Sequence, residues 1–352
     1  MRKMDAESFS VPLLRWYDEN KREMIWRDHP DPYFVWLSEI MLQQTRIEAA
    51  KEYFVRFTSE LPDIPSLASV SEERLMKLWE GLGYYNRARN LKKTAEILVE
   101  EYDGKLPEEF DQLLSLPGIG PYTAGAIASM AFGVRVPAVD GNVLRVVMRY
   151  LQCAEDISRQ SVRKKVEKMI GEVMPERPGD FNQAVMELGE VVCIPNGAPF
   201  CDRCPLNGTC LAKASGCQEE YPKKAPKKPR RIEDRTIYVL EYEGRIGIRK
   251  RPQKGLLGGL YEFPAKESFQ TLSDIKREWK GRGAGGSVIS LLGEAKHIFS
   301  HVEWHMRGYQ ILLGKEPSEA GVPDDIFFVT REELRQNYVL PTAFHFFLEK
   351  IL

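Results

Sequence analysis

The sequence predicts a mostly α-helical N-terminal domain followed by a smaller α+β domain. Apolar residues recur at helical spacing from residue 1 to about residue 217. A basic, proline-rich stretch follows, and after it the periodicity changes to that of short strands separated by glycine-containing turns. We therefore divide the chain into a helical domain at 1–217, an extended linker at 218–231 and an α+β domain at 232–352.

Composition and charge exclude several broad classes. The 352 residues carry a formal net charge of −1, so the protein is not a basic nucleic-acid coat and any DNA contact must come from a local patch. No apolar run approaches the length of a membrane span, and six cysteines in a chain of this length do not indicate a disulfide scaffold. The expectation is a soluble cytoplasmic monomer without membrane contact.

The stretch LPGIGPYTAGAIASMAFGVRVPAVDGN, residues 116–142, contains the first candidate site. Pro117 ends one predicted helix, and Gly118 and Gly120 are expected to permit a tight hairpin through positive φ angles before a second helix begins. A glycine hairpin at a helix N-terminus directs backbone N–H groups at one point, which suits a DNA phosphate. Asp140 follows as a catalytic carboxylate or, with equal weight on local pattern, as a helix cap in an ordinary helix–turn–helix corner.

A second candidate lies in FVWLSEIMLQQ, residues 34–44, a strongly apolar predicted helix with one internal carboxylate, Glu39. Burial of a carboxyl group disfavours its charged form and raises its pKa, so Glu39 is a candidate general acid. The alternative, which the segment alone favours, is a glutamate on the one solvated stripe of a buried helix. Gln44 and Thr45 end this helix with short polar side chains suited to an exposed surface.

The segment GLGYYNRAR, residues 81–89, combines glycines, aromatic rings and arginines. It suits a loop that inserts an aromatic ring between bases while Arg87 and Arg89 hold phosphates. The alternative is a glycine helix cap followed by a basic helix.

Four clustered cysteines are the strongest local signal. Seven, two and five residues separate Cys193, Cys201, Cys204 and Cys210. Four thiolates at this spacing can ligate zinc or a [4Fe–4S] cluster, and the spacing alone does not choose between them.

The C-terminal domain contains KHIFSHV, residues 296–302, between two predicted strands. An exposed aromatic ring, a hydroxyl group and imidazoles together suit recognition of a base edge. The alternative is a strand–loop junction with a buried phenylalanine.

Taken in order, these motifs resemble the helix-hairpin-helix DNA glycosylases, and within them the MutY-type adenine DNA glycosylases. The matching segments are SEIMLQQT (38–45), GLGYYNRARNL (81–91), LPGIGPYTAGAIAS (116–129), VDGNV (139–143), the cysteine cluster and FSH (299–301). The resemblance covers nearly the whole chain, and it rests on the ordered set, since no single motif suffices. It implies a helix-hairpin-helix glycosylase domain with an iron–sulfur cluster module, and a Nudix-like C-terminal domain.

The resemblance also implies an activity: removal of adenine mispaired with 8-oxoguanine or guanine in double-stranded DNA, during base excision repair. Glu39 matches the general acid that protonates adenine N7, and Asp140 matches the carboxylate that stabilises the cationic sugar. Tyr122 and Asn142 match residues that support these two. Sliding-clamp or mismatch-repair partners stay open, and a bacterial protein of this kind is expected at the nucleoid.

The remaining matched residues concern DNA and metal. Those that fill the base stack or wedge the duplex are Gln44, Thr45, Leu82 and Tyr84; those that recognise 8-oxoguanine are Phe299, Ser300 and His301. Gly118, Gly120 and Arg87 are expected at phosphates. The four cysteines match the ligands of a [4Fe–4S] cluster.

Two features depart from the family pattern. The first cysteine spacing is seven residues where six is commoner, so the loop at 194–200 is expected to bulge. GLLGGLYEFP, at 255–264, is similar to the start of the Nudix box, but the glutamate-rich metal-binding helix does not follow, so recognition rather than nucleotide hydrolysis is expected there.

Two rival functions stay open. An endonuclease III-like glycosylase with lyase activity needs an amine nucleophile, and the nicking relatives carry a lysine where this chain has Tyr122. A catalytically silent DNA-binding module would need neither Glu39 nor Asp140.

Overall fold

The computed structural model describes residues 4–27, 31–45, 47–226 and 229–352. Two compact units are present, one formed by Met1–Val70 with Asn86–Pro226, the other by Ser71–Tyr85 with Lys227–Leu352. The segment at 71–85, which lies inside the helical region of the sequence, groups with the C-terminal unit, because α5 (Glu72–Leu78) contacts α14 (Arg331–Asn337).

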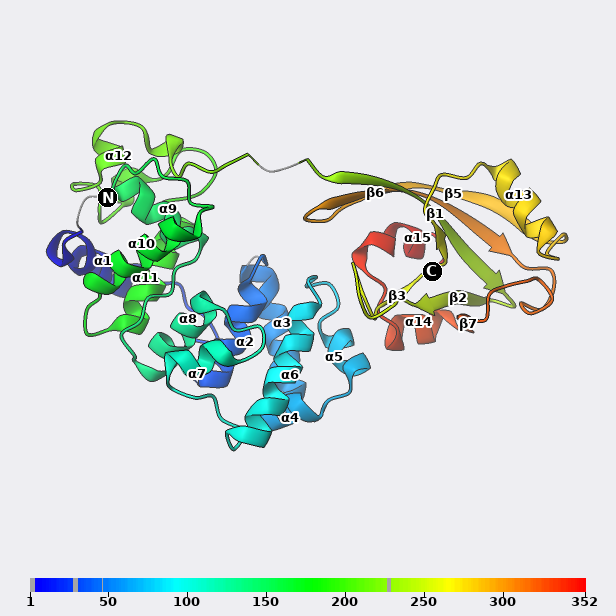
Figure 1. Ribbon diagram of the computed structural model, residues 1–352, viewed down its shortest axis with the longest axis horizontal. Coiled ribbons are helices and arrows are strands. Elements are labelled where there is room, and N and C mark those ends of the chain that lie inside the picture. The colour runs from blue at the N-terminus through cyan, green and yellow to red at the C-terminus, as the bar shows by residue number, and fades with distance from the viewer. Residues whose placement is uncertain (1–3, 28–30, 46, 227–228) are drawn as a thin grey trace. The chain divides into compact units, whose positions relative to one another are not determined.

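The first unit is helical (Figure 1). Its helices are α1 (Ala6–Asn20), α2 (Pro32–Leu42), α3 (Ile47–Glu60), α4 (Ile64–Ser69), α6 (Asn86–Glu101), α7 (Phe110–Ser115), α8 (Pro121–Phe132), α9 (Gly141–Tyr150), α10 (Gln160–Glu172), α11 (Pro178–Val191) and α12 (Leu211–Ala214). Short 3₁₀ turns at Cys201–Arg203 and Gln218–Glu220 flank α12. No helix in the described ranges is both long and apolar enough to cross a membrane.

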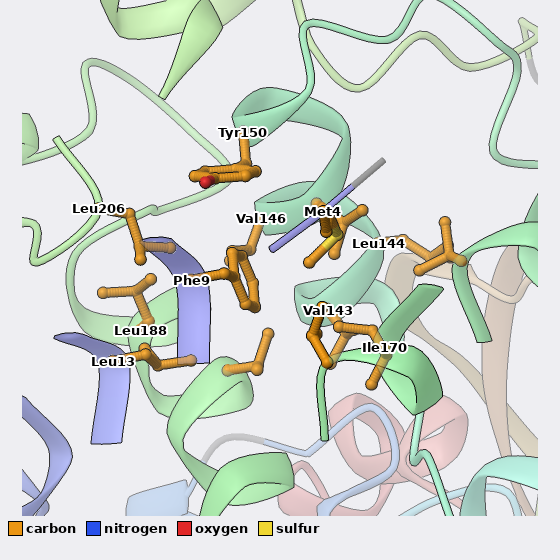
Figure 2. Close-up of a cluster of buried hydrophobic side chains, with 14 of the residues drawn as sticks. Met4, Phe9, Leu13, Val143, Leu144, Val146, Tyr150, Ile170, Leu188 and Leu206 are labelled. Carbon is orange, nitrogen blue, oxygen red and sulfur yellow. The ribbon is translucent and has the colours of Figure 1, made fainter. Parts of the chain in front are cut away.

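One core of this unit holds α1, α9, α10 and α11 together (Figure 2). Phe9 of α1 is fully buried and packs edge-on against Tyr150 of α9, with ring centroids 5.0 Å apart, and against Phe181 of α11 at 6.2 Å. Burial of one such ring contributes about 1.5–3 kcal/mol to folding. This packing holds the C-terminal end of α9 and helix α11 against the same side chain of α1.

The hairpin between α7 and α8 uses one left-handed glycine. Gly118 has φ +76°, and a Cβ there would meet Cβ of Asn90 at 2.6 Å. The expected positive φ at Gly120 is wrong: this residue has φ −91° and ψ 176° and stands at the N-cap of α8. The helix begins directly after it with Pro121, whose fixed φ suits a first helical position.

The second unit is built on a seven-stranded sheet. Its strands are β1 (Arg231–Tyr242), β2 (Arg245–Lys250), β3 (Tyr261–Glu262), β4 (Ala265–Lys266), β5 (Val288–Ile298), β6 (Val302–Leu312) and β7 (Ile326–Val329). The main order is β3-β2-β1-β6-β5, with β4 paired to β1 and β7 to β2. Strands β1 and β6 are parallel, whereas the other pairs are antiparallel.

Helices cover both faces of this sheet. Alternate residues of β1 reach opposite sides: Ile237 and Val239 join a core with α14 and α15 (His345–Glu349), while Tyr238 and Leu240 join a core with α13 (Leu272–Gly281). A 3₁₀ turn, Thr342–Phe344, precedes α15. The sequence reading did not include α13, whose start is marked by a Thr271–Asp274 capping box.

Candidate active site

One cavity of about 600 Å³ lies within the helical unit. Side chains reach it from α2, α8, α10, α11, the N-termini of α3 and α9, and the segment after α1. Glu39, Tyr122, Asp140 and Asn142, which the sequence predicts as catalytic, all line it. A cavity of this size is typical of small-ligand sites.

Glu39 is buried inside α2, with an exposed fraction of 7%. The alternative of a glutamate on a solvated stripe is therefore wrong. Burial raises the pKa of Glu39 to about 7; the hydrogen bond from Tyr122 and the charge of Arg27 lower it, and the negative charge of Asp140 raises it further. Oη of Tyr122 donates to Oε2 of Glu39, which orients the carboxyl group.

Asp140 caps a helix and also lines the cavity, so the structure is compatible with both alternatives for this residue. It is the N-cap of α9, where Oδ1 accepts a hydrogen bond of 2.8 Å from the backbone N–H of Val143. Its other oxygen, Oδ2, accepts from Nδ2 of Asn142 at 2.8 Å. Enclosure in the cavity wall raises the pKa of Asp140, although these hydrogen bonds and the charge of Arg145 counteract the shift. The cap thus also orients the carboxylate.

Arg145 is a buried residue that the sequence reading missed. Its Nη2 donates to Oδ1 of Asn142 and to the carbonyl of Gly189, both at 2.7 Å, and its Nε donates to the carbonyl of Cys193 at 2.8 Å. A guanidinium therefore joins the residue beside Asp140 to the start of the cysteine loop. The signal in the sequence was an arginine among the apolar residues of GNVLRVVMRY.

A second missed group forms one wall of the cavity, and we call it the ion cluster: Arg22, Arg27, Glu187 and Glu190. Arg22 binds Glu187 through Nε at 2.5 Å and Glu190 through Nη2 at 2.6 Å, and Arg27 binds Glu187 at 2.9 Å. The side chain of Glu187 is 1% exposed, whereas that of Glu190 is 37% exposed. Burial alone raises the pKa of Glu187, but its bonds to Arg22 and the charge of Arg27 bring it below the usual value.

The four clustered cysteines line a smaller cavity of about 30 Å³. Burial raises the pKa of the Cys204 thiol to about 12, and the charges of the other three cysteines add to the shift. Nη1 of Arg149 lies 3.4 Å from Sγ of Cys193, and Nε2 of Gln218 lies 3.4 Å from Sγ of Cys201. Across the residues that the structure describes, no three His, Cys, Asp or Glu side chains are placed to hold one metal ion.

The loop between Cys193 and Cys201 contains Gly197 with φ +76°. A left-handed glycine turns the chain sharply, and this turn lies in the loop that carries the extra residue.

The hairpin leaves backbone donors available at the start of α8. Gly120 caps this helix without a side-chain hydrogen bond. The N–H groups of a first helical turn have no intrahelical acceptors, and the helix dipole places partial positive charge there. This end of α8 is suited to an anion.

Arg87, expected at a phosphate, instead contacts the C-terminus of α2. Its Nη1 donates to the carbonyls of Ile40 at 2.6 Å and Gln43 at 2.7 Å. It therefore holds the helix that carries Glu39. Gln44 follows in a left-handed conformation with φ +62°, is exposed and lines the cavity, and Thr45 closes the turn.

The loop at 81–84, part of the second unit, is conformationally strained. Gly81, Gly83 and Tyr84 all have positive φ, which a tyrosine rarely adopts. The side chain of Leu82 is buried, with 7% exposure, while Tyr84 is 50% exposed. Oη of Tyr84 lies 3.0 Å from Oγ of Ser300, so two residues predicted to contact DNA meet within this unit.

The segment Phe299–His301 forms the turn between β5 and β6. The expectation of an exposed aromatic ring is wrong for Phe299, which is half-buried and packs on Trp304 at 4.8 Å between centroids. Ser300 and His301 are exposed. The hydroxyl and imidazole therefore stand at the surface, on a turn that the phenylalanine anchors.

Comparison with known families matches both units. Residues 37–172 match the HhH-GPD superfamily of base excision DNA repair proteins, and residues 235–350 match the NUDIX domain.

Characterised relatives match along most of the chain. The adenine DNA glycosylase of Homo sapiens is 35% identical over 94% of this chain and 71% of its own length. The adenine DNA glycosylase of Buchnera aphidicola from Schizaphis graminum is 38% identical over 76% of this chain and 78% of its own.

Solved structures match the helical part. A thermostable thymine-DNA glycosylase aligns with a TM-score of 0.54 and 26% identity over 60% of this chain and 97% of its own. An endonuclease III trapped as a covalent intermediate with DNA aligns with a TM-score of 0.52 and 25% identity over 60% of this chain and 99% of its own. Taken with the cavity that joins Glu39 to Asp140, these matches show that the chain belongs to the adenine DNA glycosylase family of base excision repair.

Proposed function

We propose that this DNA glycosylase removes adenine that stands opposite 8-oxoguanine or guanine, by acid-catalysed hydrolysis of the N-glycosidic bond and without efficient strand cleavage. One observation carries the proposal: a buried carboxyl group with a pKa of about 7 shares a cavity with a second carboxylate held by Asn142 and a helix N-terminus. The activity class is that of the family, and the roles below are assigned from this cavity.

Glu39 acts as the general acid. Adenine in a duplex lies out of reach, so the nucleotide must leave the stack and enter the cavity. A protonated Glu39 donates its proton to N7 of the purine, and adenine then leaves as a neutral base when the bond to C1′ breaks. Tyr122 keeps the carboxyl group oriented through its hydrogen bond to Oε2.

Asp140 stabilises the positive charge that develops on the sugar as the bond breaks. The two hydrogen bonds that Asp140 accepts, from Val143 N–H and from Asn142, hold it in one orientation, so little reorganisation accompanies the reaction. Water then adds to C1′, and an abasic site remains in the strand.

The endonuclease III-like alternative is disfavoured by the cavity. A Schiff base requires an amine, and no lysine lines the cavity in the described ranges. Tyr122 contributes a hydroxyl where that chemistry would need a lysine. Borohydride reduction during turnover is expected to trap little covalent protein–DNA adduct; efficient trapping would favour the lyase.

The DNA is expected to contact both units. Gly118 and Gly120 support a phosphate site at the N-terminus of α8, and Gln44 and Thr45 lie at the end of α2 beside the cavity. In the second unit, Leu82 and Tyr84 are assigned to the duplex stack. Ser300 and His301 are assigned to 8-oxoguanine, with Phe299 as the anchor of their turn.

The four cysteines line one small cavity, and four thiolates are a donor set for a [4Fe–4S] cluster or for structural zinc. Membership of the adenine DNA glycosylase family favours the cluster. When bound, the cluster supplies a covalent cross-link between α11, the following loop and α12, while Arg149 and Gln218 direct donors at two of the sulfurs.

A single-turnover assay tests the proposed function. Duplexes that differ only in the base opposite adenine are compared: 8-oxoguanine, guanine and thymine. Adenine release is expected opposite 8-oxoguanine and guanine and is expected to be negligible opposite thymine. Binding without release from any duplex would leave only a DNA-binding module.

A further inference from the structure

Besides Glu39 and Asp140, the ion cluster gives the cavity two further carboxylates, Glu187 and Glu190, to which the proposed reaction assigns no role. Glu190 stands one helical turn from Glu187 on α11, and both reach the cavity. Arg22 is held between them at 2.5 and 2.6 Å, and Arg27 binds only Glu187. Two guanidinium groups thus face two carboxylates, so the wall is electrically neutral, and it depends on Glu190 for that balance.

The charged and titratable groups around Glu39 come from the start of α9 and from α8, α10, α11 and the segment after α1. Asp140 at the start of α9 acts on Glu39 through its charge, and Tyr122 of α8 donates a hydrogen bond to Glu39. Arg163 of α10 donates a hydrogen bond to the carbonyl of Val139. The ion cluster completes the wall, and α3 contributes Ile47, which is apolar. Arg87 of α6 contacts the carbonyl end of the helix that carries Glu39.

We propose that Glu190 is a positioning residue that keeps Glu39 protonated near neutral pH, by balancing the charge of Arg22 in the cavity wall. The proposal rests on the proposed function of Glu39 as the general acid. The negative charge of Glu190 is felt at both Glu39 and Tyr122, where it raises the pKa of each group. Without it, the wall would carry a net positive charge and would favour the ionised, inactive form of Glu39.

The sign of the effect can be stated for each substitution. Glu190→Gln keeps the size of the side chain and an oxygen for Arg22 but leaves the wall with one excess positive charge, so the pKa of Glu39 falls. Arg22→Gln leaves one excess negative charge, so the pKa of Glu39 rises. Glu190→Asp keeps the balance and is expected to keep the pKa.

The experiment measures the single-turnover rate of adenine release against pH with the full-length, cluster-loaded protein. Glu190→Gln is expected to move the alkaline limb of the profile down by about half a unit to one unit, as for a charge acting through partly screened protein. Arg22→Gln is expected to move it up, and Glu190→Asp to leave it in place. Glu176→Gln is the matched control, since Glu176 also pairs with an arginine, Arg135, but lies on the surface outside the cavity.

A second readout does not depend on activity. In protein labelled with ¹³C at glutamate carboxyl groups, the resonance of Glu39, assigned with Glu39→Gln, is titrated in each variant. If the unsubstituted protein released no adenine at any pH, the proposed function would fail, and this titration would still decide the role of Glu190. A Glu190→Gln protein that is slower by the same factor at every pH, with an unshifted carboxyl titration, would overturn the inference.

Discussion

At the residue scale, the proposed reaction requires Glu39 and Asp140 in opposite protonation states within one cavity. Glu39 is useful when protonated, and its burial provides that state near neutral pH. Asp140 is useful when ionised, and it accepts two hydrogen bonds that favour the charge, whereas Glu39 accepts one, from Tyr122. Different hydrogen-bond donors around the two carboxyl groups thus favour different protonation states within the same cavity.

Replacing Asp140 by Asn tests the second role. The amide retains an oxygen for the N–H of Val143, so the cap and the fold are expected to persist, but the negative charge beside the sugar is lost. We expect binding of the A:8-oxoguanine duplex within about threefold of normal and adenine release slower by at least about 10²-fold, as for loss of an electrostatic group. Near-normal release would show that the carboxylate assignment is wrong.

The pH dependence of release follows from the two raised pKa values. As pH rises through about 7, Glu39 loses the proton it must donate, so the rate is expected to fall. As pH falls toward the raised pKa of Asp140, this group gains a proton and loses its charge, so the rate is expected to fall again. A bell-shaped single-turnover profile is therefore expected. A rate that climbs steadily above pH 8 would contradict the role of Glu39.

At the scale of elements, the close approach of α9 and α11 sets the position of Asn142. A Cβ added at Gly189 of α11 would lie 2.6 Å from Cβ of Asn142. The glycine is therefore required for packing, although glycine inside a helix is intrinsically unfavourable by about 0.5–1 kcal/mol relative to alanine.

Gly189→Ala is expected to displace Asn142 and the carboxylate it binds. The predicted result is a loss of about 1–3 kcal/mol of stability from overpacking, together with slower adenine release. Gly171→Ala in α10 is the matched control, because nothing lies within 4 Å of its added Cβ and the helix should gain stability. Thermal unfolding and single-turnover rates of the two variants distinguish the effect of overpacking between α9 and α11 from the general effect of replacing a helical glycine by alanine.

At the scale of the whole molecule, base removal and recognition of the opposite base are assigned to different units. The cavity lies entirely within the helical unit, whereas Ser300 and His301 lie in the other. Removal of residues 232–352 is therefore expected to lower the ratio of release rates for A:8-oxoguanine over A:G by at least about tenfold, as expected for loss of one or two hydrogen bonds. The finer variant Ser300→Ala should lower the same ratio in the full chain. An unchanged ratio in both proteins would remove the recognition role from this turn.

Much of this organisation was predictable from local pattern. The apolar spacing that predicts α2 and the change to strand periodicity after the linker depend on neighbours in the chain, and a helix and strands form there. Helix α13 was not predicted. The expectations that needed correction concerned conformation and exposure. Gly120 has an extended backbone because a helix begins at the next residue, and Phe299 is covered because Trp304 comes from the neighbouring strand.

By itself, the sequence determined which residues are candidates for chemistry: two carboxyl groups, a glycine hairpin and four cysteines, each next to the residues that shape its backbone. Only the tertiary structure decided the protonation states of the two carboxyl groups. Burial and charge arise from side chains distant in sequence, such as Tyr122 against Glu39 and Arg22 between Glu187 and Glu190. A pKa depends on the charges and water around a group in space, so it is not a property of the local segment.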